Sequence, residues 1–407
     1  VSEHGDSTRR AFWSSWPNLG PPLGNLMAAG ALAILSGVMS EEAFLSWGWR
    51  VGFWLSVVIV AVGYYIRTHV TDAAIFKETQ QEIIEAKGGT RQLRPNDVVI
   101  DIVYSGLCGT DLHYRKADMV LGHEGVGVVS QVGSEVRNFK VGDRAGWGYN
   151  HKSCGYCDHC FEGWDTLCSE RTMYGVKDLD FGSFGDRAVI DADYVHKIPE
   201  GIDLRSAGPF QCGGSTVYGA IVHAGVKAND RVGVLGLGGL GHLAVQYLAK
   251  MGCEVVVFSG TNSKREQAMQ LGAHEFVASK ENPKFEGVKP LSSLIVTTSF
   301  LPDWDLYFSV MKRNGTIVPL SVSFDEMRLP YASLLMNQLC VKASLVAPRL
   351  IHRQMLEFSA RNNIVPMIEE LEMNEEGLNT AFDRLDKGDV RYRFVLRNPR
   401  YQGPAVK

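Results

Sequence analysis

The 407-residue sequence has no marked excess of charge of either sign, since 41 Lys and Arg oppose 45 Asp and Glu. It contains no basic stripe, which excludes an electrostatic nucleic-acid-binding surface. Nor is it poor in apolar residues: they make up 45% of the chain, which excludes an intrinsically disordered protein. Cysteine is scarce, with 8 residues in the whole chain, so a disulfide framework of the small secreted type is excluded as well. The length indicates two or three domains.

Half of these cysteines lie in one short stretch, SCGYCDHCFEGWDTLC, as Cys154, Cys157, Cys160 and Cys168. Four thiolates on a tight loop can surround one zinc ion and leave no coordination position open, which is typical of a structural site. His159 is an alternative ligand within the same loop. The alternative interpretation of the cysteines, without a metal, is a redox pair or reduced thiols. The spacing favours a structural zinc.

Residues 1–87 have a different character. Two apolar runs lie at residues 23–39 and 51–66: the first contains three glycines, and the second has tryptophan and tyrosine near its ends. They predict a transmembrane helical hairpin over residues 23–66 with both outer ends in the cytoplasm, or else a buried hairpin of a soluble protein. A polar helix follows, and Gly88–Gly89 predicts the junction with the next domain.

The stretch at residues 9–77, RRAFWSSWPNLG…SEEAFLSWGWRVGFWLSVVIVAVGYYIR, resembles two central helices of a metabolite:proton symporter of the major facilitator superfamily. Two helices cannot form an alternating-access pathway between repeats, which argues against transport by this chain alone. The arrangement is interpreted either as a natural fusion or as a joining error in a gene model.

A second group of metal-ligating residues is spread over three motifs, GLCGTDLH, GHEGVG and QCGGSTVY. Cys108, His123 and Cys212 provide three zinc ligands with a fourth position free, the pattern of a catalytic zinc. Glu124 either reaches the metal or lies behind it. Asp111 is in a position to orient His123 through the other ring nitrogen. Taken singly, each of these residues is more typical of a protein core.

The stretch RVGVLGLGGLG predicts a strand, a glycine-rich turn and a helix, followed by the strand EVVVF. This context indicates a dinucleotide site, in which the turn and the helix N-terminus hold the pyrophosphate. The turn comprises Gly236, Leu237, Gly238, Gly239, Leu240 and Gly241.

The residues after the second strand bear on the choice of dinucleotide. An NAD site has an acidic residue there, whereas this chain has Ser259, followed by Thr261, Ser263 and Lys264. Hydroxyls and a cation suit a 2′-phosphate and predict NADP(H). The alternative is that Lys264 and Arg265 are solvated residues at the start of a helix.

Taken together, these motifs make residues 90–397 similar to the zinc-dependent medium-chain alcohol dehydrogenases, in the cinnamyl alcohol dehydrogenase branch. The resemblance implies an α/β fold with a GroES-like β-rich catalytic domain and a doubly wound Rossmann sheet. The expected segments are a helical segment at 1–87, a catalytic domain at 88–207, a Rossmann domain at 208–347 and a return to the catalytic domain at 348–407.

The resemblance also implies roles for single residues. Thr110 would pass the alcohol proton through the cofactor ribose to His113, and Thr216, Thr297 and Ser321 would lie near the cofactor. It further implies two zinc ions per chain, NADP(H), a small aldehyde or alcohol as substrate, and a homodimer.

Two departures from the family pattern are visible in the sequence. The first strands of the catalytic domain are replaced by the transporter-like segment, and the loop HYRKADMVLGH between His113 and His123 is short. Both changes predict an exposed sheet edge and a looser site. Competing hypotheses are a polyol dehydrogenase, a membrane transport component and an inactive zinc protein.

Overall fold

The computed structural model describes residues 30, 33–48, 50, 93–320, 322 and 326–404. The chain divides into two compact units, residues 1–92 and 93–407. In the first unit the structure gives α2 (Glu41–Ala43), which Ser40 caps through its side chain, and the π-helical η2 (Phe44–Gly48). The predicted hairpin at residues 23–66 falls largely outside the described residues. Within the described part, no helix is both long enough and apolar enough to cross a bilayer.

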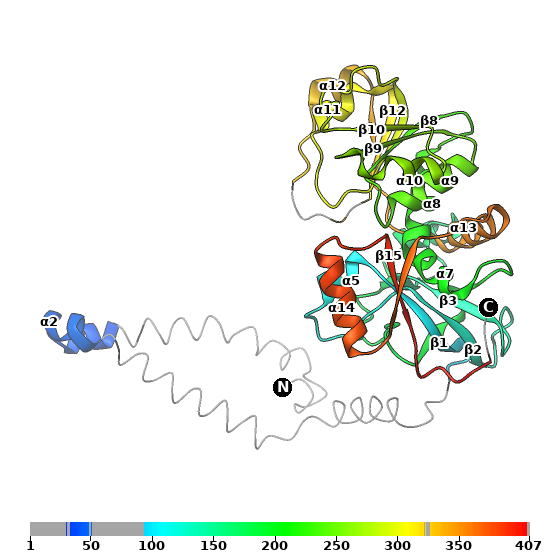
Figure 1. Cartoon of the computed structure of the whole chain (residues 1–407). Coiled ribbons are helices and arrows are strands. Elements are labelled where there is room, and N and C mark those ends of the chain that lie inside the picture. The colour runs from blue at the N-terminus through cyan, green and yellow to red at the C-terminus, as the bar shows by residue number, and fades with distance from the viewer. Residues whose placement is uncertain are drawn as a thin grey trace. The chain divides into compact units, whose positions relative to one another are not determined.

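The second unit contains a seven-stranded, mainly antiparallel sheet in the order β14-β15-β1-β2-β3-β7, with β6 also paired to β1 (Figure 1). β1 is long enough to pair with β2 along its length, with β6 at its start and with β15 at its end. The strands are β1 (Asp97–Leu107), β2 (Gly125–Val132), β3 (Arg144–Trp147), β6 (Arg187–Asp191), β7 (His196–Lys197), β14 (Ile368–Glu372) and β15 (Arg393–Arg397), with β4 (Asn150–Lys152) and β5 (Thr172–Met173) forming a separate ribbon.

Helices of different lengths accompany this catalytic-domain sheet. They are α5 (Gly109–Tyr114), α6 (Asp158–Phe161), η3 (Asp165–Leu167), η4 (Ala192–Tyr194), α7 (Leu204–Pro209), η5 (Phe210–Gly214), α8 (Ser215–Ala224), α13 (Arg349–Asn362) and α14 (Glu375–Asp386). α13 contacts α8, and α14 packs on β14. The chain therefore leaves the catalytic domain through α8 and returns to it through α13.

The chain between α8 and α13 forms a six-stranded parallel sheet in the order β10-β9-β8-β11-β12-β13. Numbered within the domain this is 3-2-1-4-5-6, the order expected of a dinucleotide-binding sheet. Its elements are β8 (Arg231–Leu235), α9 (Gly241–Lys250), β9 (Glu254–Ser259), η6 (Asn262–Lys264), α10 (Arg265–Gln270), β10 (Glu275–Ala278), β11 (Leu291–Val296), α11 (Trp304–Ser309), β12 (Met311–Pro319), α12 (Tyr331–Met336) and β13 (Cys340–Val341).

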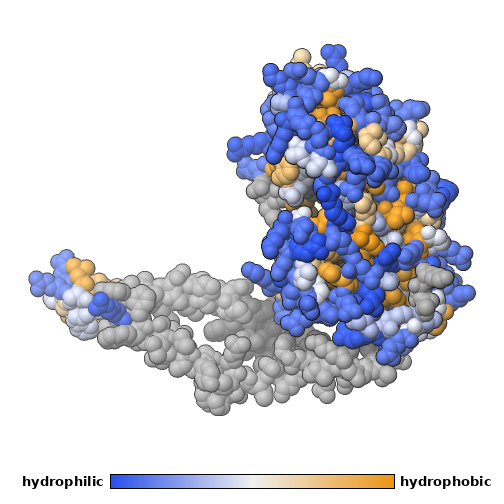
Figure 2. Space-filling model, in the orientation of Figure 1, coloured by the Kyte–Doolittle hydropathy of each residue, from blue (hydrophilic) through white to orange (hydrophobic). Residues whose placement is uncertain are grey.

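Successive strand residues point to opposite faces of this sheet, and β9 shows the consequence. Val255 and Val257 join one hydrophobic core, while Val256 and Phe258 join another. The first of these cores also includes Val103 and Val126 from the catalytic sheet, so the two domains share buried apolar contacts. The face seen in Figure 2 is largely hydrophilic, as expected once this apolar surface is buried.

Candidate functional site

Three of the predicted zinc ligands converge, although they come from separate elements. Cys108 caps the N-terminus of α5, His123 precedes β2, and Cys212 lies in the π-helical η5 between α7 and α8. Their ligand atoms, together with a carboxylate oxygen of Glu124, all lie within 4.8 Å of one another. The Sγ atoms of Cys108 and Cys212 are 3.9 Å apart. Two thiolates bound tetrahedrally at about 2.3 Å would be about 3.8 Å apart, so the pair fits one zinc ion.

The His123 ring shows where a metal would bind. Its Nδ1 lies 2.9 Å from Asp111 Oδ1, while its Nε2 is buried and has no hydrogen-bond partner among the described residues. Burial disfavours the charged ring, but the charge and hydrogen bond of Asp111 outweigh it and raise the pKa of His123 well above its ordinary value. A zinc ion would take the place of that proton on Nε2. The donor set therefore fits a zinc ion.

The Asp111 carboxylate hydrogen-bonds to two of the zinc ligands. It is fully buried, and its Oδ2 accepts a hydrogen bond of 2.9 Å from the backbone N–H of Cys108, which closes the first turn of α5. Its Oδ1 also accepts a hydrogen bond of 2.9 Å from the hydroxyl of Tyr174. One carboxylate thus fixes the backbone of one zinc ligand and the ring of another.

Glu124 is fully buried and forms an ion pair with Arg393, the first residue of β15. Its Oε2 has no hydrogen-bond partner among the described residues. A Cβ at position 106 would stand 1.8 Å from that oxygen, which explains why β1 has Gly106 there. Burial raises the pKa of Glu124 to about 7, against the lowering effect of Arg393. Glu124 lies within reach of the ligand cluster but is held by the arginine.

The thiols of the pair differ in acidity. The pKa of Cys108 lies well below its ordinary value. Its hydrogen bond with Cys212 has the largest effect, and the hydrogen bond with His123 and the charge of Arg393 lower the pKa further. Thr110 Oγ1 lies 3.8 Å from Cys108 Sγ, and His113, three residues further along α5, is exposed. The proposed proton-relay residues thus lie on the same short helix as the first ligand.

The second cysteine cluster also comes together. The ligand atoms of Cys154, Cys157, Cys160 and Cys168 lie within 4.8 Å of one another, and Cys154 and Cys160 have their Sγ atoms 3.9 Å apart. Cys168 is buried and accepts a hydrogen bond from the backbone N–H of Cys154. His159 is not part of this group among the described residues. Four sulfur atoms at this separation fit a structural zinc ion.

The glycine-rich turn has the geometry that a pyrophosphate requires. Gly236 has a φ of +94°, which favours glycine, and a Cβ at position 241 would stand 2.0 Å from the Gly236 carbonyl oxygen. Space is open beside Gly238, where the backbone can approach a ligand. The N-terminus of α9 follows at Gly241 and favours an anion. The turn therefore fits the dinucleotide.

The other predicted cofactor residues have varied positions. Thr297 donates its hydroxyl to the carbonyls of Leu235 and Gly236, at 2.9 and 3.0 Å, and so braces the glycine turn. Thr216 is buried in α8, and Leu237 is buried in the turn while Leu240 is partly exposed. Lys264 Nζ donates to the Leu237 carbonyl at 2.8 Å. Ser321 lies outside the described residues.

The loop that replaces the acidic residue starts at Ser259, the last residue of β9. Thr261 and Ser263 have their hydroxyl oxygens 3.0 Å apart on the exposed surface of that loop. These hydroxyls and Lys264 therefore border the end of the strand where a ribose is expected.

Two residues that contact the zinc-site residues, Arg393 and Tyr174, were not singled out from the sequence. His242, which follows the glycine motif, was expected to be a residue of the helix N-terminus rather than a catalyst, and it lies in the first turn of α9. It donates from Nδ1 to the Gly238 carbonyl while its Nε2 accepts from the backbone N–H of Met367. Burial lowers the pKa of His242 to about 4, so the ring is neutral and ties the glycine turn to the catalytic domain. An arginine at the start of an otherwise apolar strand, RFVL, was the one available signal for Arg393.

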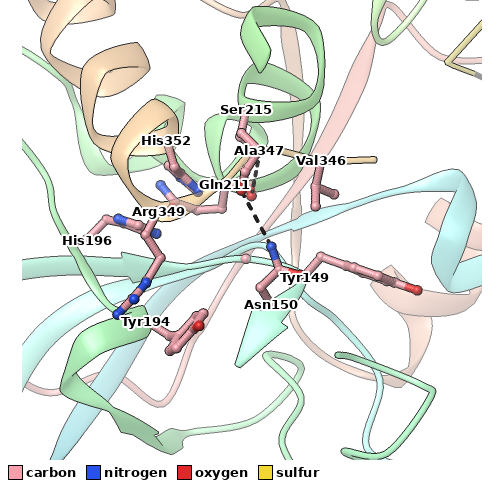
Figure 3. Close-up of a pocket in the computed structure, with 11 residues that line it drawn as sticks. Tyr149, Asn150, Tyr194, His196, Gln211, Ser215, Val346, Ala347, Arg349 and His352 are labelled. Atoms are coloured by element: carbon pink, nitrogen blue, oxygen red, sulfur yellow. Dashed lines mark hydrogen bonds between the residues drawn. The ribbon is translucent and has the colours of Figure 1, made fainter. Parts of the chain in front are cut away.

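A small cavity lies beside Gln211 and Ser215, near the end of η5 (Figure 3). It is lined by polar side chains, among them Gln211, Asn150 and two histidines, His196 and His352. The two imidazole rings stack with their centroids 3.8 Å apart. Burial lowers the pKa of His196 to about 3 and that of His352 well below its ordinary value, so both rings are neutral. This pair joins strand β7 of the catalytic sheet to α13.

Comparison with known proteins agrees with this geometry. Residues 94–200 match the alcohol dehydrogenase GroES-like domain, and residues 239–361 match the zinc-binding dehydrogenase domain. The chain is 36% identical over 314 residues to "Aldehyde reductase AdhA" of Synechocystis sp., covering 75% of this chain and 92% of that protein. It is 35% identical over 321 residues to "NADP-dependent alcohol dehydrogenase C 1" of Mycolicibacterium smegmatis, covering 75% of this chain and 91% of that protein.

Among solved structures, a cinnamyl alcohol dehydrogenase from Sorghum bicolor is 32% identical, with a TM-score of 0.70 over 76% of this chain and 92% of that one. The transporter-like part of the sequence resemblance finds no support in these comparisons. The predicted combination of a GroES-like and a Rossmann domain is confirmed, and the chain belongs to the zinc-binding medium-chain alcohol dehydrogenase family.

Proposed function

We propose that the chain interconverts aldehydes and alcohols with zinc and NADP(H), and that it works in the cell as an aldehyde reductase. The observation that carries this proposal is the convergence of Cys108 and Cys212 with His123, whose buried Nε2 has no hydrogen-bond partner within the part of the chain that the structure describes. Three ligands leave the fourth position of a tetrahedral ion for substrate, as in a catalytic zinc site. The relatives named as an aldehyde reductase and an NADP-dependent alcohol dehydrogenase support the same reaction class.

The chain's own residues hold and orient the zinc ligands and transfer the substrate proton. When bound, zinc would polarise the substrate oxygen and NADP(H) would exchange a hydride with the substrate carbon. Asp111 holds His123 in the orientation in which Nε2 faces the cysteines. The Thr110 hydroxyl, close to Cys108, exchanges the proton of the substrate alcohol, and His113 passes it to solvent.

The preference for NADP(H) over NAD(H) follows from charge at the end of β9. Ser259 stands where an NAD site has a carboxylate, so a 2′-phosphate meets no like charge there. Lys264, bonded to the glycine turn at Leu237, supplies a cation in the same loop. The ratio of kcat/KM for NADPH and NADH tests this preference, and equal values would refute it.

A Cys108→Ser substitution tests the site. We expect turnover of an aldehyde panel with NADPH to be abolished while NADPH binding, followed by its fluorescence, is retained. A Cys340→Ser variant is the matched control, because Cys340 is exposed and lies on β13, away from both cysteine clusters. Unchanged turnover in the Cys108 variant would contradict the assignment.

We also propose a cytoplasmic catalytic domain and a homodimer, both by family resemblance, and light scattering tests the second. The membrane hairpin at residues 23–66 stays a prediction from the sequence. Extraction of the full chain without detergent would refute it.

A further inference from the structure

Two cations flank one aromatic ring at the edge of the dinucleotide site. Lys264 Nζ lies 5.0 Å from the centre of the Tyr392 ring, and the guanidinium carbon of Arg391 lies 5.9 Å from the same ring. The two side chains come from different domains. Lys264 ends η6 after β9 of the parallel sheet, whereas Arg391 lies two residues before β15 of the catalytic sheet.

The segment that carries Arg391 packs directly on the glycine-rich turn. A Cβ at Gly239 would stand 3.3 Å from the Tyr392 carbonyl oxygen and 3.1 Å from Arg393 Cδ. The Tyr392 ring lies 5.2 Å from the His242 ring, and its hydroxyl donates to Gln267 of α10. Arg391 is therefore held beside the turn by its neighbours in the chain.

Neither cation has a carboxylate partner among the described residues. Lys264 Nζ donates to the Leu237 carbonyl, and Arg391 Nη1 donates to Gln267 Oε1 at 3.2 Å. Glu369 accepts from the backbone N–H of Arg391, but its ion pair is with Arg384. Burial, and then the charge of Arg391, lower the pKa of Lys264. Two neighbouring cations repel each other, and an anion bound between them would relieve that repulsion.

We propose that Arg391 is a second ligand for the 2′-phosphate of NADP(H), presented by the catalytic domain beside Lys264. The inference rests on the NADP(H) use proposed above. The phosphate dianion on the adenosine ribose is the anion that reaches the end of β9, where Ser259 lies. A guanidinium suits phosphate oxygens because its paired N–H groups donate in one plane. The same phosphate thus contacts both domains.

Binding of coenzymes to an Arg391→Gln variant tests the proposal without turnover. The full chain is titrated calorimetrically with NADPH and NADH, and with the fragments 2′,5′-ADP and 5′-AMP. We expect the Kd for NADPH and 2′,5′-ADP to rise about 10-fold in the variant. The Kd for NADH and 5′-AMP should stay within about twofold, since these lack the phosphate.

Two further variants separate charge from structure. Arg361→Gln removes the same charge from the exposed face of α13 and should leave all four Kd values unchanged. Arg391→Lys keeps the charge and should bind NADPH more tightly than Arg391→Gln. Equal weakening of NADPH and NADH in the Gln variant would assign Arg391 a structural role and overturn the proposal.

The role of Arg391 and the preference for NADP(H) can be tested separately. If Lys264→Gln weakens NADPH binding but Arg391→Gln does not, the inference about Arg391 is wrong and the NADP(H) preference stands. If the unmodified chain binds NADH as tightly as NADPH, both are wrong.

Discussion

Replacement of Asp111 by Asn should weaken the catalytic zinc site while leaving the structural one intact. The carboxylate makes three hydrogen bonds of 2.9 Å, to His123 Nδ1, the Cys108 backbone N–H and the Tyr174 hydroxyl. Asn keeps the volume but has only one acceptor oxygen, so its NH₂ group must face either the Cys108 N–H or the Tyr174 and His123 donors. The charge that supports a metal-bound imidazole is lost as well.

The size of the effect follows from the role of such partners. Loss of a group that orients a metal ligand typically weakens metal binding about 10- to 100-fold, which corresponds to about 1.4–2.7 kcal/mol. Because Asp111 is buried and its partners are buried with it, we expect the upper part of this range.

Zinc affinity is measured by competition with a chromogenic chelator, which should resolve two releases per chain. In Asp111→Asn only one release should move to lower chelator concentration. Tyr174→Phe, which removes one of the three bonds and leaves His123 Nδ1 paired, should shift the same release less. If circular dichroism shows that Asp111→Asn is folded and neither zinc release shifts, Asp111 does not support the catalytic zinc site.

Further predictions concern the cysteine loop and the histidine pair. Cys168→Ser should lower the zinc content from two ions to one and make residues 153–168 sensitive to protease, and a variant that still holds two ions would contradict the structural site. The histidine pair should make the fold acid-sensitive: both pKa values are depressed in the folded chain, so the unfolded chain binds more protons and stability falls as pH drops below about 6.5. At pH 5.5 the loss is at most about 1.4 kcal/mol per histidine, and urea unfolding of His352→Phe should show a shallower dependence on pH. An identical pH dependence in that variant would show that other groups are responsible.

Local sequence patterns predicted the parts of the molecule that are local in structure. The glycine turn, its flanking strands β8 and β9 and the cysteine loop each lie within a short stretch of chain, so spacing alone indicated them. Cys108, His123 and Cys212 were proposed as zinc ligands from their residue types, but about a hundred residues separate the first and the last, so no local spacing supported their grouping and the family resemblance strengthened it.

Contacts between distant segments could not be predicted from the sequence. Arg393 meets Glu124 across 269 positions, and no periodicity in either segment indicates that pairing. The stacked His196 and His352 likewise come from β7 and α13. Hydropathy also favoured a membrane hairpin near the N-terminus, which no described helix and no comparison supports.

The loop of four cysteines has little apolar packing of its own, with Phe161 and Tyr156 77% and 64% exposed. Its conformation therefore depends on the metal–sulfur bonds. An oxidant that converts one thiolate to a sulfenic acid would release the ion and expose three more reactive thiols. The working lifetime of the protein under peroxide would then be set by this loop rather than by the global free energy of unfolding.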